Sequence, residues 1–123
     1  MVKLTFCLRR LPHLSQEAFQ RYWREQHAPL VRQHAAALRI RRYVQCHTLT
    51  VPANEALQRS RGTAEPYDGV AELWWESLED LAAALDTPAG RQADRALRED
   101  EQRFIDLGRS CAWFSREEPV IES

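Results

Sequence analysis

The chain has 123 residues, enough for one compact domain with a hydrophobic core and too few for two. Its 17 basic residues are scattered and balanced by 18 acidic ones, which excludes the basic patch typical of proteins that bind nucleic acid or acidic membranes. The chain also lacks an apolar run of the roughly 20 residues that a membrane helix needs, and its N-terminus lacks the layout of a secretory signal. We therefore expect a soluble, cytoplasmic protein in which residues 1–123 form one domain.

The first predicted elements are a strand and a long helix. Apolar and polar residues alternate strictly over 2–9, which predicts a β-strand. Ser15 is a suitable N-cap for a helix that ends near Arg39, in which apolar residues recur at three- and four-residue steps. Pro29 has no backbone N–H, so we expect the helix to kink or restart there and to leave a backbone acceptor near His27 that can fix the tautomer of its ring.

His27 allows two interpretations. Most partly buried histidines pack on an inward face and make one hydrogen bond. Imidazole also titrates near neutral pH, so the same residue could serve as a general acid or base. The spacing alone does not decide between these roles.

The middle of the chain contains two further predicted strands and a connection. β-Branched and aromatic residues over 41–51 predict a strand, and residues 67–75 predict another with large apolar groups on both faces. The stretch 52–66 is rich in Ala, Arg, Ser and Glu and reads as a long exposed connection, with a short helical turn at 54–60.

The last third of the sequence predicts two helices and a final strand. Ser77 caps a short helix, and Thr87 followed by Pro88 starts a second one that continues an apolar stripe. Residues 111–121 predict the last strand. Each of the three cysteines falls in a predicted strand without a CxxC pair, so we expect small core residues rather than a disulfide scaffold or a nucleophile.

The order strand, helix, strand, strand, helix, strand is that of the split βαβ, ferredoxin-like α+β motif. Its helices cover one face of an antiparallel sheet and leave the other face open. Tryptophans on both faces of the third strand then predict that a second copy covers the open face, most simply in a twofold homodimer.

Two segments of the chain resemble the EthD family. They are the helix segment with Phe19, Tyr22, Trp23 and His27–Pro29, and the segment Tyr67–Ser77. The resemblance spans nearly the whole chain and implies a ferredoxin-like βαββαβ subunit that forms a dimeric α/β barrel, with a cavity between sheet and helices. Fungal proteins that resemble this family act as dehydratases or decarboxylases in aromatic polyketide pathways. Fold is implied more securely than chemistry.

The resemblance points to His27 and to the acids Asp68 and Glu72. These two acids cannot share a proton, because four residues along a strand span about 13 Å. If the second and third strands are antiparallel neighbours, Tyr43 and His47 could lie opposite or diagonal to the acids. A structural role competes for both acids: a turn at Gly69 for Asp68, and for Glu72 an ion pair with a basic residue, namely Lys3, Arg9 or Arg42.

The leading hypothesis is cofactor-free acid/base catalysis of dehydration, cyclisation or decarboxylation on a small apolar or aromatic metabolite. Its catalytic residues would be His27, Glu72, Tyr43 and His47, and its ligand-binding residues Tyr22, Trp23, Asp68 and Trp74. The alternatives are a non-catalytic ligand-binding accessory protein for a partner oxygenase and a cofactor-free monooxygenase. We expect no metal, because the histidines lack HxH, HxxxH or HExxH spacing, and no nucleotide or flavin, because the glycines are isolated.

Overall fold

A four-stranded antiparallel sheet organises the computed structural model, which describes residues 1–122. The strands are β1 (Val2–Leu8), β2 (Arg42–His47), β3 (Gly69–Trp75) and β4 (Cys111–Ser115), in the spatial order β2-β3-β1-β4. Every neighbouring pair is antiparallel. This is the ferredoxin-like α+β arrangement that the element order predicts.

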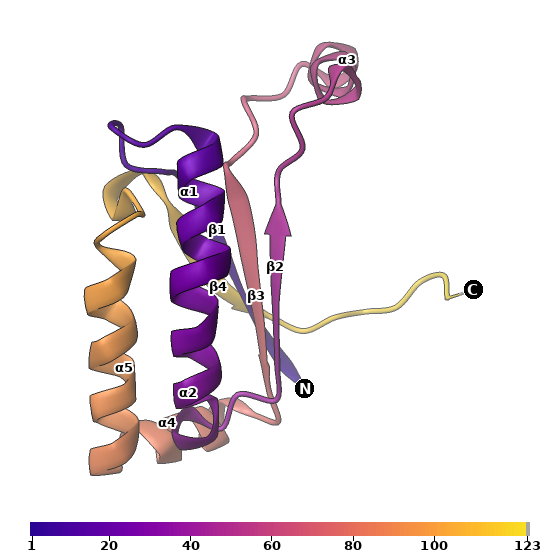
Figure 1. Ribbon diagram of the computed structural model, residues 1–123. Helices are drawn as coiled ribbons and strands as arrows, with labels where there is room; N and C mark the ends of the chain where they lie inside the picture. The colour runs from indigo at the N-terminus through magenta and orange to yellow at the C-terminus, as the bar shows by residue number, and fades with distance from the viewer. Residues whose placement is uncertain (123) are drawn as a thin grey trace.

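Four of the helices lie together on one face of the sheet (Figure 1). They are α1 (Gln16–Tyr22), α2 (Ala28–Leu38), α4 (Leu78–Leu85) and α5 (Pro88–Glu101), and α2 packs beside α5. The predicted caps are confirmed, because the hydroxyls of Ser15, Ser77 and Thr87 each accept a backbone N–H in the first turn of the following helix.

Three predicted boundaries differ from the structure. The second strand ends at His47 and the last at Ser115, both well before their predicted ends. The connection 52–66 contains a ten-residue helix, α3 (Pro52–Arg61), which projects from the end of the sheet and buries no residue (Figure 1). This helix is mostly polar and packs no residue into the core, so its composition resembles that of an exposed connection, and only a short turn is predicted there.

A π-helical turn, η1 (Trp23–His27), joins α1 to α2 into one continuous rod. Pro29 cannot donate a backbone hydrogen bond, and the helix widens by one residue, so that the N–H of Ala28 bonds to the carbonyl of Trp23. The turn buries the Trp23 indole against the sheet, where a Cβ at Gly69 would overlap the ring. The glycine therefore allows the helix layer to approach β3.

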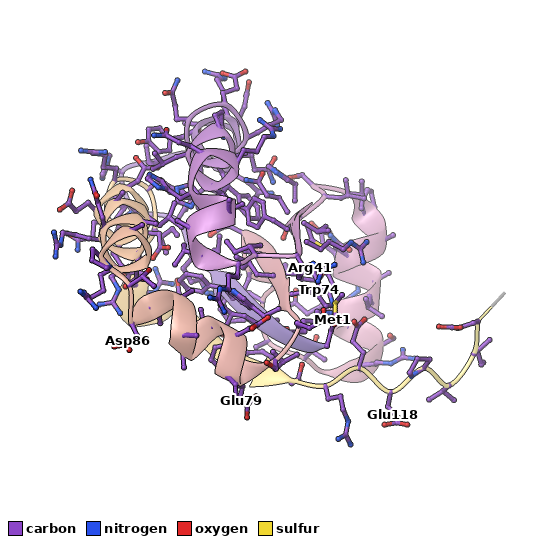
Figure 2. The ribbon with its side chains drawn as sticks, turned by 90° about the horizontal axis from the view of Figure 1, so that it is seen from below. Met1, Arg41, Trp74, Glu79, Asp86 and Glu118 are labelled. Carbon is purple, nitrogen blue, oxygen red and sulfur yellow. The ribbon has the colours of Figure 1, made fainter. Side chains whose placement is uncertain are left out.

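The other sheet face has no helix over it. Its residues are Lys3, Thr5, Cys7, Arg42, Val44, Cys46, Val70, Glu72, Trp74, Cys111, Trp113 and Ser115. Cys46 and Cys111 are exposed there, so the prediction of three core cysteines holds in this chain only for Cys7. The carboxylate of Glu117, in the C-terminal segment, accepts the Trp74 indole N–H, and this segment then runs away from the body of the protein (Figure 2).

Among residues 1–122, no helix is long and apolar enough to cross a membrane.

Candidate functional site

A buried carboxylate on α5 holds His27. Nδ1 of the imidazole lies 2.7 Å from Oδ2 of Asp100, and both residues are about 5% exposed (5% and 4%). The hydroxyl of Tyr22 donates to Oδ1 of the same carboxylate at 2.6 Å, and the guanidinium of Arg103 donates to it at 3.0 Å. Three donors from α1, η1 and the end of α5 thus converge on one aspartate.

The charges of this cluster follow from its hydrogen bonds. Burial works against the ionised form of Asp100, but the hydrogen bonds from Tyr22, His27 and Arg103 outweigh it and lower the pKa of the carboxyl below its usual value. Burial lowers the pKa of His27, and the bond to Asp100 only partly offsets this effect. At neutral pH the pair is therefore an aspartate beside a neutral imidazole.

The tautomer of His27 is set by the same geometry. An ionised carboxylate can only accept, so Nδ1 carries the proton and Nε2 carries the lone pair. Within the described residues, Nε2 makes no hydrogen bond and is not among the fully buried atoms that lack a partner. The side chain of Asp100 fixes the tautomer, so the prediction that a freed backbone carbonyl does so is wrong.

Sequence reasoning missed Asp100, although the chain offers one signal for it. The residue follows Ala93 and Leu97 at helical spacing, so an acid occupies a position of the buried stripe of α5. Its partner lies 73 positions away in the sequence, a separation that no local pattern reveals.

A second polar network lies on the helix-facing side of β2. The Gln45 amide donates to the carbonyl of Trp23 (3.0 Å) and to the hydroxyl of Tyr43 (2.9 Å), and its oxygen lies 2.8 Å from Nε2 of His47. Burial raises the pKa of Tyr43, and hydrogen bonding to Gln45 offsets part of that shift. The proton of the Tyr43 hydroxyl has no acceptor among residues 1–122, so this group can donate to a ligand.

His47 stacks on the indole of Trp23, with ring centroids 4.4 Å apart. Because the Gln45 oxygen accepts from Nε2, the lone pair lies on Nδ1, which is buried without a hydrogen-bond partner. Burial, with a smaller contribution from the charge of Arg24, lowers the pKa of His47 and keeps it neutral.

A cleft of about 430 Å³ opens between α2 and β2. Tyr43 and Gln45 line it together with Ala28, the residue that follows His27 in the chain. The remaining lining residues are Arg24, Val31, Arg32, Ala35, Ile40, Arg41 and Arg42. Its volume is in the range of small-molecule sites.

Glu72 and Trp74 lie away from these groups. The register pairs Tyr43 with Leu73 and His47 with Gly69, whereas Glu72 pairs with Val44. The prediction that Tyr43 and His47 lie opposite the strand-three acids is therefore wrong, because a shift of one residue along a strand changes the sheet face.

On the open face, Glu72 forms an ion pair with Lys3 and accepts a hydrogen bond from Cys46. These hydrogen bonds lower the pKa of Glu72 despite its partial burial. Trp74 is covered on the same face by the side chains of Lys3 and Arg42. Neither residue lines the space near His27.

Asp68 has a structural environment. Its carboxylate is buried and accepts the backbone N–H of Arg10 at 2.8 Å and the guanidinium of the same residue at 2.6 Å. These bonds join the end of β1 to the start of β3. The competing interpretation of Asp68 as a structural residue fits this geometry, with Arg10 rather than Gly69 as the partner.

Glu101 is a titratable neighbour that the sequence did not reveal. It follows Asp100 at the end of α5, and burial, with the charges of Asp94 and Asp100, raises its pKa to about 7. Its charge also contributes to the raised pKa of Tyr43 on β2. A carboxyl that titrates near neutral pH thus lies close to both polar networks.

No group of three or more His, Cys, Asp or Glu side chains that could hold a metal occurs in the described part of the chain. Residues 11–108 match the EthD domain family. The chain belongs to the EthD family.

Several solved structures share this fold. An EthD family protein from Bacillus halodurans is 19% identical with a TM-score of 0.63, covering 96% of this chain and 99% of that one. A dimeric ferredoxin-like protein from Thermobifida fusca is 14% identical with a TM-score of 0.57, covering 93% and 88%. A provisionally assigned antibiotic biosynthesis monooxygenase from Deinococcus radiodurans is 14% identical with a TM-score of 0.54, covering 100% and 98%. No curated protein matches the chain.

Proposed function

We propose that this EthD protein is a homodimeric enzyme that performs cofactor-free acid/base chemistry, such as dehydration, cyclisation or decarboxylation, on a small apolar or aromatic metabolite. The observation that carries the proposal is the Asp100–His27 pair. A buried carboxylate holds one nitrogen of a neutral imidazole and leaves the lone pair of the other nitrogen without a partner. This is the arrangement of an oriented general base.

The proposed reaction begins when Nε2 of His27 takes a proton from a carbon next to a substrate carbonyl. The imidazolium that forms is stabilised by Asp100, which is already ionised and hydrogen-bonded by Tyr22 and Arg103. The Tyr43 hydroxyl, whose proton has no acceptor among residues 1–122, donates a hydrogen bond to the carbonyl oxygen as negative charge develops there. The protonated His27 then returns its proton to a leaving hydroxyl or to the product carbon. Trp23, Phe19 and Phe104 give the surroundings an aromatic character.

The homodimer is the second part of the proposal. The sheet face without helices exposes Trp113, which is 48% accessible in the single chain. The Thermobifida relative with the same fold is described as dimeric. A second copy on this face would bury Trp113 and would leave the helix layer, with its cleft, on the outside of the sheet pair.

The test uses 2-tetralone, a small aromatic ketone, and follows deuterium incorporation next to its carbonyl by NMR. We expect the protein to accelerate exchange and His27→Ala to reduce the acceleration about a hundredfold or more, at a cost of about 0.5 to 3 kcal/mol in stability. His13→Ala is the matched control, because His13 is exposed in the turn before α1. Unchanged exchange and binding in His27→Ala would identify the imidazole as a packing residue and favour the carrier alternative.

A further inference from the structure

Arginines converge on the cleft between α2 and β2. Arg24, Arg32, Arg41 and Arg42 all line it, and none of its lining residues is acidic. The whole chain has a net charge of −1, so this concentration of positive charge is local. Figure 2 shows Arg41 beside Trp74 at the end of the sheet, where the Arg41 N–H bonds to the Trp74 carbonyl at 2.8 Å.

Two of these four arginines, Arg24 and Arg32, form no ion pair within residues 1–122, whereas the other two have a contact. Arg41 pairs with Glu76 at 3.0 Å, and the Arg42 guanidinium lies 4.5 Å from the centre of the Trp74 ring. Arg24 and Arg32, which project from the helix rod, form no ion pair with any carboxylate of residues 1–122. Both are exposed and lie two helical turns apart on the same rod.

The arginines of a second cleft, by contrast, lie beside carboxylates. This cleft is lined by Arg9, Arg10 and Arg109, but the carboxylates of Glu65 and Asp68 line it as well. Arg10 is paired with Asp68 there at 2.6 Å. In that cleft Arg10 and Arg109 pair with Asp68 and Asp106 and the Arg9 guanidinium donates to the Pro66 carbonyl, whereas Arg24 and Arg32 of the α2–β2 cleft have no carboxylate partner among residues 1–122.

The lining of the α2–β2 cleft also includes apolar side chains and two uncharged polar ones. Ala28, Val31, Ala35 and Ile40 supply the apolar surface. Tyr43 and Gln45 supply a hydroxyl with a free proton and an amide. A ligand that fits would have an apolar body, an anionic group toward the arginines and an oxygen that can accept from Tyr43.

We propose that this cleft binds an aromatic or apolar carboxylate, with Arg24 and Arg32 as the residues that select the anionic group. The inference rests on the proposed function, because Tyr43, which lines this cleft, also contacts the substrate in the proposed reaction. A guanidinium matches the two oxygens of a carboxylate, and Ala28 and Val31 pack on the apolar body of the ligand. The preferred substrates of the enzyme are then acids, and a neutral ketone of the same size binds more weakly.

The test compares 2-naphthoate with neutral 2-naphthamide, which has the same rings, by isothermal titration calorimetry. We expect 2-naphthoate to bind about tenfold or more tightly, since hydrogen bonds to charged groups are the stronger ones. The variant Arg24→Gln/Arg32→Gln should remove this preference and leave the affinity for 2-naphthamide unchanged. Arg59→Gln/Arg61→Gln, on the exposed helix α3, is the matched control and should behave as wild type.

Three outcomes would overturn the inference. They are equal affinity for the two probes, a preference that persists in Arg24→Gln/Arg32→Gln, and inorganic phosphate alone binding as tightly as 2-naphthoate. Because the readout is binding, it is independent of the exchange test on His27. A carboxylate preference without catalysis would support this inference and count against the acid/base mechanism.

Discussion

The polar groups on the two faces of the sheet differ in their burial and in their hydrogen bonds. On the helix-facing side, His27 and Asp100 are almost completely buried and their protons are assigned by hydrogen bonds. On the open side, Glu72 and Lys3 remain partly accessible to solvent and satisfy each other. Both pairs combine an acid with a basic side chain, yet only the first leaves a nitrogen lone pair without a partner.

The difference shows that cover from the helices, rather than residue type, decides how these polar groups are buried and how their pKa values shift. Burial shifts the pKa of His27 downward, whereas hydrogen bonding dominates the downward shift of Glu72. A buried neutral base retains its reactivity at pH 7, while a solvated ion pair contributes little beyond local stability.

Asp100→Ala should have the largest effect on stability. It removes the acceptor of His27, Tyr22 and Arg103 and leaves buried donors unpaired, so we expect a loss of about 3 to 5 kcal/mol in urea unfolding at pH 7. Asp94→Ala is the control, because Asp94 pairs with an exposed Arg98 and should cost less than about 1 kcal/mol. Similar losses in the two variants would contradict a special role for the buried carboxylate.

Glu101→Gln should change the pH dependence of stability. The folded-state pKa of Glu101 is about 7, above the value of 4.5 expected for the unfolded chain, so the fold favours its protonated form. Stability from this group is complete below about pH 4.5 and is lost as the pH rises through 7. The glutamine variant should therefore be more stable than wild type at pH 8, by about 1 to 3 kcal/mol, and similar to it at pH 4.5. Glu99 lies on the exposed side of α5, so the control Glu99→Gln should differ from wild type in stability by the same amount at both pH values. If Glu101→Gln behaved like this control, the raised pKa of Glu101 would be refuted.

Trp113→Asp tests the open face as a dimer interface. Burying a charge in place of an aromatic anchor should weaken association by about 2 kcal/mol, or roughly thirtyfold in Kd. Light scattering should give about twice the subunit mass of 14.3 kDa for wild type and a lower mass for the variant at the same micromolar concentration. Leu78→Asp is the control, since Leu78 is equally exposed (49%) but lies on α4. A monomeric wild-type protein would refute the dimeric α/β barrel.

Glu72→Gln should have the smallest effect. Its ion pair with Lys3 is partly accessible to solvent, so the stability loss should be under about 1 kcal/mol. Deuterium exchange into 2-tetralone should equal that of wild type, because Glu72 lies across the sheet from His27. A large drop in exchange with unchanged stability would restore Glu72 to the catalytic set.

The sequence by itself determined the order of the elements and several local details. The alternation in β1, the caps at Ser15, Ser77 and Thr87 and the break at Pro29 are local properties, set by side chains within a few residues of one another. The EthD resemblance, confirmed over residues 11–108, also predicted the fold. His27 could be singled out because an imidazole titrates near neutral pH and because the resemblance covers its position, whereas Tyr43 was named for a position opposite the strand-three acids that the register does not give it.

Only the tertiary structure decided how those residues combine. Asp100 reaches His27 because α5 packs beside the first helix rod, and this depends on contacts between residues far apart in the sequence. The sheet register places Glu72 and Trp74 on the sheet face without helices. The sequence does not specify this register, and a shift of one residue would move each side chain to the opposite face. The convergence of Arg24, Arg32, Arg41 and Arg42 on one cleft likewise arises from the packing of α2 against β2, because charges scattered along a chain form a site only when the fold brings them together.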